Sequence, residues 1–129
     1  MRLLLDTHVL LWSQSDPERL GPAREVLLNP ANELFVSTAA AWEIAIKTGT
    51  GKLRLPVPAA SWWPTRLAAL QARALSIEPD DVLSVAGLPH LHRDPFDRLM
   101  IAQARRRDLR LVTGDQQVWA YGGDLLEVR

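Results

Sequence analysis

Cysteine is absent from all 129 residues of this chain. Its absence excludes disulfide bonds, zinc sites built from thiolates and cysteine nucleophiles. Long apolar runs are missing as well, because no segment approaches the roughly 20 apolar residues that a membrane-spanning helix requires. The first residues become charged too early for a secretory signal peptide. We therefore expect a soluble cytoplasmic protein that does not act in a membrane.

An excess of charge of either sign is also missing, since 15 Lys and Arg residues balance 15 Asp and Glu residues. This balance argues against an evenly basic surface that binds nucleic acid regardless of sequence. A local acidic site and local basic patches would still cancel in such a sum. Hydrophobic residues make up 47% of the chain, which is enough for a core, and the length fits a single domain over residues 1–129.

Short apolar segments alternate with segments of helical character along the whole chain. We expect strands at residues 2–5, 34–36, 74–77, 109–113 and 125–128. We expect helices at residues 7–13, 21–28, 38–47, 59–72 with an interruption at Pro64, 80–86, 95–107 and 115–119. This alternation predicts an α/β fold in which a mostly parallel sheet lies between two layers of helices.

Four acidic residues stand where apolar segments end or are interrupted: Asp6, Glu43, Asp97 and Asp115. Carboxylates that gather at the edge of a core repel one another unless a cation neutralises them. Hard oxygen ligands of this kind favour Mg²⁺ or Mn²⁺. The pattern therefore predicts a metal-dependent enzyme of phosphoryl transfer.

Three of these acids also have a purely structural interpretation. Asp6 and Asp115 could each cap the helix that follows a strand. Asp97 could be the third residue of a capping box that begins at Asp94, with Pro95 in the first helical position. If the first and fourth strands are neighbours, however, Asp6 and Asp115 meet in the crevice where the strand order reverses, which is where open α/β sheets bind ligands.

Glu43 is harder to explain by structure alone. It is the only charged residue of the segment 39–46, and its structural interpretation is a helical ion pair with Lys47. The helix is apolar on nearly every face, so a carboxylate there either faces a cleft or carries a desolvation cost. We therefore favour a functional role for Glu43.

Four segments, taken in order, resemble the PIN-domain ribonucleases, and among them the VapC-type toxins of bacterial and archaeal toxin–antitoxin pairs. The segments are Leu3 to His8, Ser37 to Leu53, Asp94 to Ala104 and Val112 to Asp115. The resemblance implies a PIN-like three-layer sandwich with a parallel five-stranded sheet in the order 3-2-1-4-5. It also implies a metal-dependent endoribonuclease whose products carry 5′-phosphate and 3′-hydroxyl ends.

The same resemblance implies roles for the individual residues. Asp6, Glu43, Asp97 and Asp115 correspond to the four catalytic acids of the family. Asp6, Asp97 and Asp115 would bind the Mg²⁺ or Mn²⁺ ion, and Glu43 would bind a second ion or orient the attacking water. Ser37 and Thr113 match polar positions near the site, and Thr113 is a candidate substrate contact. Gly114 departs from the residues that the family commonly has before its fourth acid.

An RNA substrate needs positive contacts near the carboxylates, because its phosphates would otherwise be repelled. Lys47 and Lys52 flank the Glu43 helix and are the preferred candidates. Further candidates are Arg54, Arg98 and the run Arg105, Arg106 and Arg107. The resemblance implies two protein partners, a small cognate antitoxin and a second copy of the chain in a homodimer.

Histidines and tryptophans receive no catalytic role. His8, His90 and His92 have no partner at a spacing typical of catalysis or metal binding. Core positions are expected for Trp12, Trp42 and Trp119, whereas Trp62 and Trp63 fit either the core or a partner surface.

Two other functions stay open from the sequence. One is a phosphotransferase or phosphatase that uses Asp6 as its nucleophile, although such enzymes usually place a second acid close to the first, where this chain has Thr7 and His8. The other is a non-catalytic binding module whose acids hold a structural cation.

Overall fold

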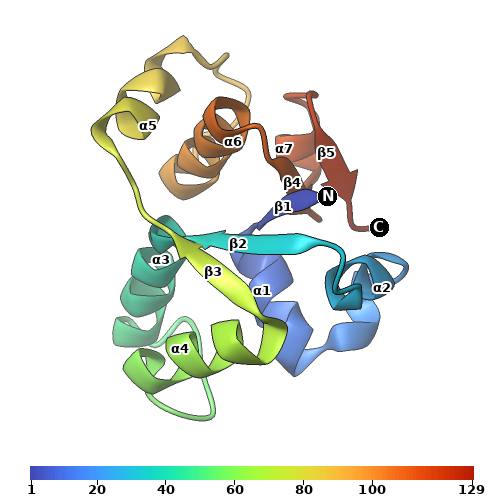
Figure 1. The fold of residues 1–129 in the computed structure, drawn as a ribbon. Helices are drawn as coiled ribbons and strands as arrows, with labels where there is room; N and C mark the ends of the chain where they lie inside the picture. Colours follow the sequence, from blue (N-terminus) through green and yellow to red (C-terminus); the bar gives the residue numbers. More distant parts are fainter.

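One parallel sheet organises the chain, and the computed structural model describes residues 1–129. The strands are β1 (Arg2–Leu5), β2 (Glu33–Ser37), β3 (Ala72–Leu75), β4 (Arg110–Thr113) and β5 (Leu125–Glu127). They lie in the order β3-β2-β1-β4-β5, and every neighbouring pair is parallel (Figure 1). The predicted α/β class and strand order are therefore confirmed.

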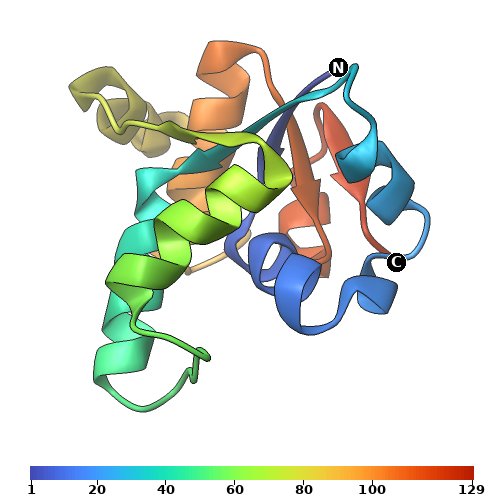
Figure 2. The same cartoon turned by 60° about the horizontal axis from the view of Figure 1, so that its bottom comes forward.

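Helices cover both faces of this sheet, as Figure 2 shows with α1 and α4 in front of it and α6 behind. The α-helices are α1 (Thr7–Ser15), α2 (Ala23–Leu28), α3 (Thr38–Gly49), α4 (Ala59–Leu70), α5 (Pro79–Ser84), α6 (Pro95–Arg107) and α7 (Gln116–Trp119). Short 3₁₀ helices, η1 (Pro17–Leu20) and η2 (Val85–Gly87), follow α1 and α5. None of the helices combines the length and apolar composition that a bilayer crossing needs.

The alternation of side chains along the strands divides the core in two. Leu3 and Leu5 of β1 join the cluster beneath α1 to α4, whereas Leu4 joins the cluster beneath α6. This is the two-residue period of a strand that is buried on both faces. All three leucines are fully buried, so β1 is the centre of both clusters and fixes the position of the residue that follows it, Asp6.

Two predictions around α4 and β3 need correction. The third strand begins at Ala72 rather than at residue 74, because Gln71 takes up a left-handed conformation with φ 54° that ends α4 and starts the strand at once. The sequence of this strand, with two alanines, carries little strand propensity and was expected to extend the helix instead. Helix α4 continues through Pro64 without the predicted interruption.

The tryptophans are not distributed between the core and the surface as predicted. Trp62 lies in the core with 3% of its surface exposed, and Trp63 and Trp12 pack against the same cluster. Trp42 is 60% exposed, and its ring meets the edge of Phe96 at a centroid distance of 5.1 Å. A core position for Trp42 was therefore wrong, because the buried face of α3 is formed by other residues, Ala39, Ala40, Glu43 and Ile44.

Most arginines that were proposed as RNA contacts instead hold the fold together. Arg98 is buried and donates hydrogen bonds to the Pro89 carbonyl (2.9 Å) and the Tyr121 hydroxyl (2.9 Å). Arg106 and Arg107 both bind the carboxylate of Asp81, which is completely buried. These side chains serve α5 and α6 as internal partners, which removes them from the list of RNA contacts.

The buried Asp81 is the main polar link between α5 and α6. Burial favours the protonated acid, but the hydrogen bonds from Arg107, the Glu78 backbone, Gln103 and Arg106 outweigh it and lower the pKa of Asp81 to about 2. A carboxyl whose folded pKa lies below its unfolded value stabilises the fold above the unfolded pKa and loses this effect as the pH falls. Asp81 therefore contributes stability above about pH 4 that disappears between about pH 4 and pH 2.

We expect Asp81→Asn to lower the free energy of unfolding by about 2–3 kcal/mol at neutral pH, because it leaves two arginines without their buried partner. Urea unfolding measured at about pH 7 and about pH 3 tests this, since the deficit should shrink as the wild-type carboxyl becomes protonated. Asp80→Asn is the matched control, because Asp80 is exposed and its pair with Arg106 is long at 3.6 Å. Equal effects of the two substitutions would contradict this account.

Candidate functional site

The site lies where the strand order reverses, at the carboxyl ends of β1 and β4. Leu5 is paired with Val112, and the backbone N–H of Asp6 donates to the Val112 carbonyl at 3.1 Å. Helix α6 runs back across the sheet into β4, so its first turn, which carries Asp97, begins at this same edge. Residues that are far apart in sequence therefore meet at one ligand-binding edge, as in other open α/β sheets.

Two of the predicted acids are both helix caps and site residues. Asp6 Oδ1 accepts the N–H of Val9 at 2.8 Å and caps α1. Asp115 Oδ1 accepts the N–H of Gln117 at 2.8 Å and caps α7. The structural and functional interpretations are thus compatible, because each cap uses one carboxylate oxygen and orients the other.

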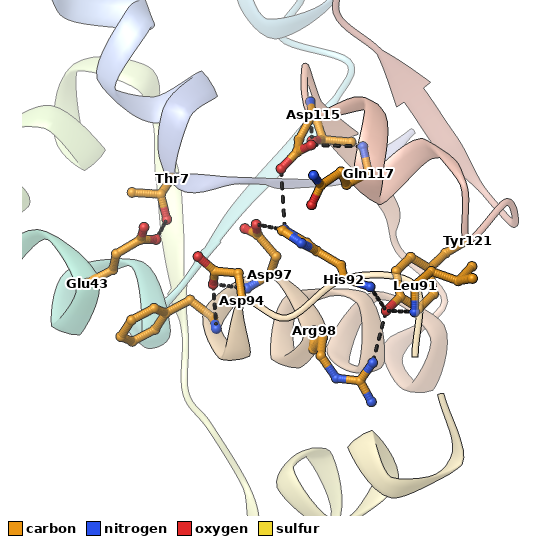
Figure 3. A network of polar contacts seen from close by, with 12 residues as sticks. Thr7, Glu43, Leu91, His92, Asp94, Asp97, Arg98, Asp115, Gln117 and Tyr121 are labelled. Carbon is orange, nitrogen blue, oxygen red and sulfur yellow. Dashed lines mark hydrogen bonds and ion pairs between the residues drawn. The ribbon is translucent and has the colours of Figure 1, made fainter. Parts of the chain in front are cut away.

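Asp97 is not part of a capping box, because its neighbour Asp94 caps α6 alone. Asp94 Oδ1 accepts the N–H groups of Phe96 (2.8 Å) and Asp97 (3.1 Å), which confirms the capping role that was favoured for Asp94. The carboxylate of Asp97 is left free to face the site, where its Oδ2 lies 2.7 Å from Nε2 of His92 (Figure 3).

Glu43 is buried in the middle of α3, with 3% of its surface exposed. Its Oε1 accepts a hydrogen bond from the Thr7 hydroxyl at 2.6 Å, and its Oε2 accepts one from Lys47 Nζ at 2.6 Å. The predicted helical pair with Lys47 therefore exists, but it compensates a buried charge and is not a surface pair. Sequence reasoning missed Thr7, which ties α1 to α3 at this point.

Burial gives Asp6 an unusual affinity for protons. It is the main cause that raises the pKa of Asp6 to about 6. Hydrogen bonds from Thr113 and Val9 lower this pKa, and the charges of Asp115 and Glu43 raise it. The ionised form of Asp6 thus lacks a compensating positive charge.

The pKa of Asp97 is raised for the same reason as that of Asp6. Burial raises the pKa of Asp97 to about 6, and the contact with His92 opposes this rise. The charges of Asp94, Asp6 and Glu43 raise the pKa further. Because Asp6 and Asp97 each respond to the charge of other acids in the site, the predicted carboxylates share one electrostatic environment.

His92 is the site residue that sequence reasoning rejected. Its Nε2 lies 2.7 Å from Asp97 Oδ2 and 3.4 Å from Asp115 Oδ2, and the three donor atoms all lie within 4.8 Å of one another (Figure 3). Asp6 does not belong to this closest group, although its charge acts on Asp97. No sequence motif indicates His92 as a site residue, because it stands in an irregular segment between η2 and α6.

The remaining polar positions act mainly on the backbone. Ser37 caps α3 by accepting the N–H of Ala39 at 3.0 Å, and Thr113 Oγ1 accepts the N–H of Asp115 at 3.1 Å. A side chain at Gly114 would begin 2.9 Å from the ring of Trp12. The departure at Gly114 therefore lets the turn after β4 pass close to this ring and places Asp115 over the site.

Comparison with known proteins gives the family. A family model described as the PIN domain matches residues 3–122. The chain is 32% identical over 117 residues to Ribonuclease VapC22 of Mycobacterium tuberculosis, which covers 90% of this chain and 88% of that protein.

The chain belongs to the PIN-domain family. Solved structures agree on the fold, although their sequences are more distant. VapBC2 from Rickettsia felis, solved with a DNA fragment from its promoter, superposes with a TM-score of 0.73 over 98% of both chains at 16% identity. VapBC-5 from Mycobacterium tuberculosis gives a TM-score of 0.63 at 20% identity, over 99% of this chain and 98% of that one.

The donor atoms of this PIN-domain site fit a divalent cation. Carboxylate oxygens from four residues share one edge of the sheet, and two of them have a pKa raised to about 6. Lys47 is the only lysine or arginine that forms an ion pair with any of the four. A bound divalent ion would supply the positive charge that the carboxylates otherwise lack.

The raised pKa values predict how the stability of the metal-free protein depends on pH. Carboxyls with a folded pKa above the unfolded value contribute stability that is present at low pH and is lost as the pH rises through the folded pKa. For Asp6 and Asp97 this loss lies between about pH 4 and about pH 6 and amounts to roughly 3 kcal/mol per carboxyl at most.

Urea unfolding in EDTA, compared between about pH 4.5 and about pH 7, measures this loss. Mg²⁺ or Mn²⁺ should restore stability at the higher pH, and Asp97→Asn should reduce both the loss and the restoration. A metal-free protein that becomes more stable across this interval would contradict the assignment.

Proposed function

We propose that the chain is a metal-dependent endoribonuclease and the toxin of a VapBC-type toxin–antitoxin pair. The observation that carries this proposal is the meeting of Asp6, Glu43, Asp97 and Asp115 at the edge between β1 and β4 of a PIN-domain sheet. Support comes from the name of the relative with 32% identity, a ribonuclease, and from relatives solved as toxin–antitoxin complexes. RNA is therefore the proposed substrate.

The proposed metal ligands are the carboxylates of Asp6, Asp97 and Asp115. When bound, Mg²⁺ or Mn²⁺ would activate a water and stabilise charge on the phosphate oxygens during in-line displacement. The caps on α1 and α7 hold Asp6 and Asp115 in fixed orientations, which limits their motion before the reaction. Glu43, held by Thr7 and Lys47, would orient the water or bind a second ion.

A nucleophilic role for Asp6 has less support. Asp6 is 4% exposed, and one of its two oxygens is occupied by the cap of α1. His8, which stands in place of the second acid of phosphotransferases, is exposed, and its ring lies tilted beside that of Trp12 at a centroid distance of 5.8 Å. A purely structural cation has no observation in its favour here, so the nuclease is the function that we propose.

Two substitutions test the proposed catalytic site. Asp6→Asn and Asp97→Asn should each lower Mg²⁺-dependent or Mn²⁺-dependent cleavage of a labelled RNA by roughly 100-fold or more, because each removes a ligand charge. Asp108→Asn is the matched control, since Asp108 is exposed at the other end of α6 in a left-handed conformation that Asn also tolerates. Thermal unfolding should stay cooperative in all three variants.

The outcome that rules out the assignment is cleavage at the wild-type rate by either site variant. Loss of cleavage in the Asp108→Asn control would show that the assay reports folding and not the site. EDTA should abolish cleavage by the wild-type protein, and added Mg²⁺ or Mn²⁺ should restore it.

The basic side chains that are still available to contact the RNA backbone lie at the end of α3 and just after it. Lys47 is partly exposed beside Glu43, and the N–H of Lys52 donates to the Lys47 carbonyl at 2.9 Å. Lys52 and Arg54 are exposed and form no ion pair, so their charges are available to phosphates. We propose Lys47 and Lys52 as substrate contacts, with Arg54 as an additional one. Thr113, the third candidate from the sequence, is completely buried and its hydroxyl is engaged by the Asp115 N–H, so it supports the acids of the site and does not contact the substrate.

Salt dependence tests the two exposed members of this group. Lys52→Ala and Arg54→Ala together should weaken binding of single-stranded RNA and reduce the slope of log affinity against log salt by about 0.7 for each lost contact. Binding is measured by fluorescence anisotropy with an inactive Asp97→Asn background. Arg24→Ala, in the exposed part of α2, should leave the slope unchanged, and an equal effect of Arg24 would contradict the assignment.

A small antitoxin is the proposed protein partner, in line with the toxin–antitoxin complexes among the structural relatives. An apolar hollow of about 500 Å³ lies next to the acidic site, and Trp42, Val82, Phe96 and Leu99 line it. Trp42 and Val82 are 60% and 50% exposed, so a hydrophobic segment of the antitoxin would bury them. We also propose that the toxin forms a homodimer.

A further inference from the structure

The imidazole of His92 occupies a position suited to metal binding. Its Nε2 lies 2.7 Å from Asp97 Oδ2 and 3.4 Å from Asp115 Oδ2. Ligand atoms that share one first-row ion, at about 2.1 Å from each, are themselves about 3 Å apart when adjacent in an octahedron. The two separations from the nitrogen bracket that value, whereas a histidine that merely approached a surface acid would contact one carboxylate.

The position of His92 is built by the fold. The backbone N–H groups of Leu91 and His92 both donate to the Tyr121 hydroxyl, at 3.3 Å and 3.1 Å. The same hydroxyl accepts a hydrogen bond from Arg98, and both of these side chains are 8% exposed (Figure 3). A buried Arg–Tyr pair therefore fixes the segment that carries the imidazole, in the manner of groups that orient the ligands of metal sites.

His90, two residues earlier, shows what an uninvolved histidine looks like in the same segment. It is exposed and forms no hydrogen bond or ion pair. The contrast indicates that the placement of His92 is specific and is not a property of the segment as a whole.

We propose that His92 Nε2 is a direct ligand of the divalent ion, together with Asp97 and Asp115, and that it makes the site prefer Mn²⁺ over Mg²⁺. This inference rests on the metal-dependent function proposed above and names one of the ligands. Mg²⁺ strongly favours oxygen ligands, whereas the first-row transition ions accept an imidazole nitrogen beside carboxylates, with an affinity that is lowest for Mn²⁺ and rises along the series. One nitrogen added to the carboxylates of Asp6, Asp97 and Asp115 makes a mixed ligand set that selects against Mg²⁺.

Binding of Mn²⁺ alone, without RNA, tests the proposal. In the wild-type protein, pulsed electron paramagnetic resonance of bound Mn²⁺ should show nitrogen hyperfine coupling from a coordinated imidazole. His92→Ala should lose this coupling and bind Mn²⁺ at least about tenfold more weakly in calorimetry. His90→Ala, the matched control, should keep both the coupling and the affinity.

A second substitution keeps the test valid if His92→Ala disturbs folding. His92→Asp replaces the nitrogen by an oxygen donor, so the preference for Mn²⁺ over Mg²⁺, measured as the ratio of the two dissociation constants, should fall while Mg²⁺ binding persists. Nitrogen coupling should also be absent in this variant. Thermal unfolding of each metal-free variant reports whether the fold is intact.

Three results would overturn the inference, and they are distinguishable from one another. Mn²⁺ bound by the wild-type protein without nitrogen coupling would show that His92 is not a ligand, although the proposed function would stand. Tighter Mn²⁺ binding by His92→Ala would show that the imidazole competes with the ion for its site. Failure of the wild-type protein to bind either ion would overturn both the inference and the proposed metal-dependent function.

Discussion

The concentration of negative charge at the end of β1 and β4 is the constraint on which the rest of the site depends. Parallel strands deliver Asp6 and Asp115 to one edge, and α3 and α6 add Glu43 and Asp97. Burial and mutual repulsion raise the pKa of Asp6 and of Asp97 to about 6, which is the energetic cost of holding these acids together. A divalent cation relieves this cost, and hence the demand for metal follows from the fold itself.

Local contacts determine the orientation in which each carboxylate meets such a cation. The caps of α1 and α7 hold one oxygen of Asp6 and one of Asp115. Glu43 differs, because one of its oxygens is paired with the ammonium group of Lys47, whereas neither Asp6 nor Asp115 pairs with a lysine or arginine. This difference supports ligand roles for the two capping acids and a role for Glu43 in positioning water, since a carboxylate whose charge is already compensated gains less from a metal ion.

Local patterns in the sequence predicted the sheet and the four acids. The apolar runs end at Leu5 and Thr113, and the acid that follows each run, Asp6 or Asp115, marks the edge of the sheet. His92 could not be found in this way, because its place depends on a contact between Arg98 and Tyr121, 23 residues apart in sequence. Trp42 misled for a related reason: its apolar neighbours indicate a helix but do not show which face is buried. Local signals therefore predict elements well, whereas long-range polar contacts decide which side chains enter the site.

The positions of the basic residues explain how a chain with balanced charge can still have basic side chains available beside its acidic site. Arg98 is held by Tyr121 beside the segment of His92, whereas Arg106 and Arg107 are held by Asp81 at the other end of α6. Exposed positive charges without an ion pair flank the site on two sides, at Lys52 and Arg54 after α3 and at Arg93 next to His92. A polyanion that approaches the carboxylates would therefore meet basic side chains on both sides of the acidic centre, although the net charge of the whole chain is zero.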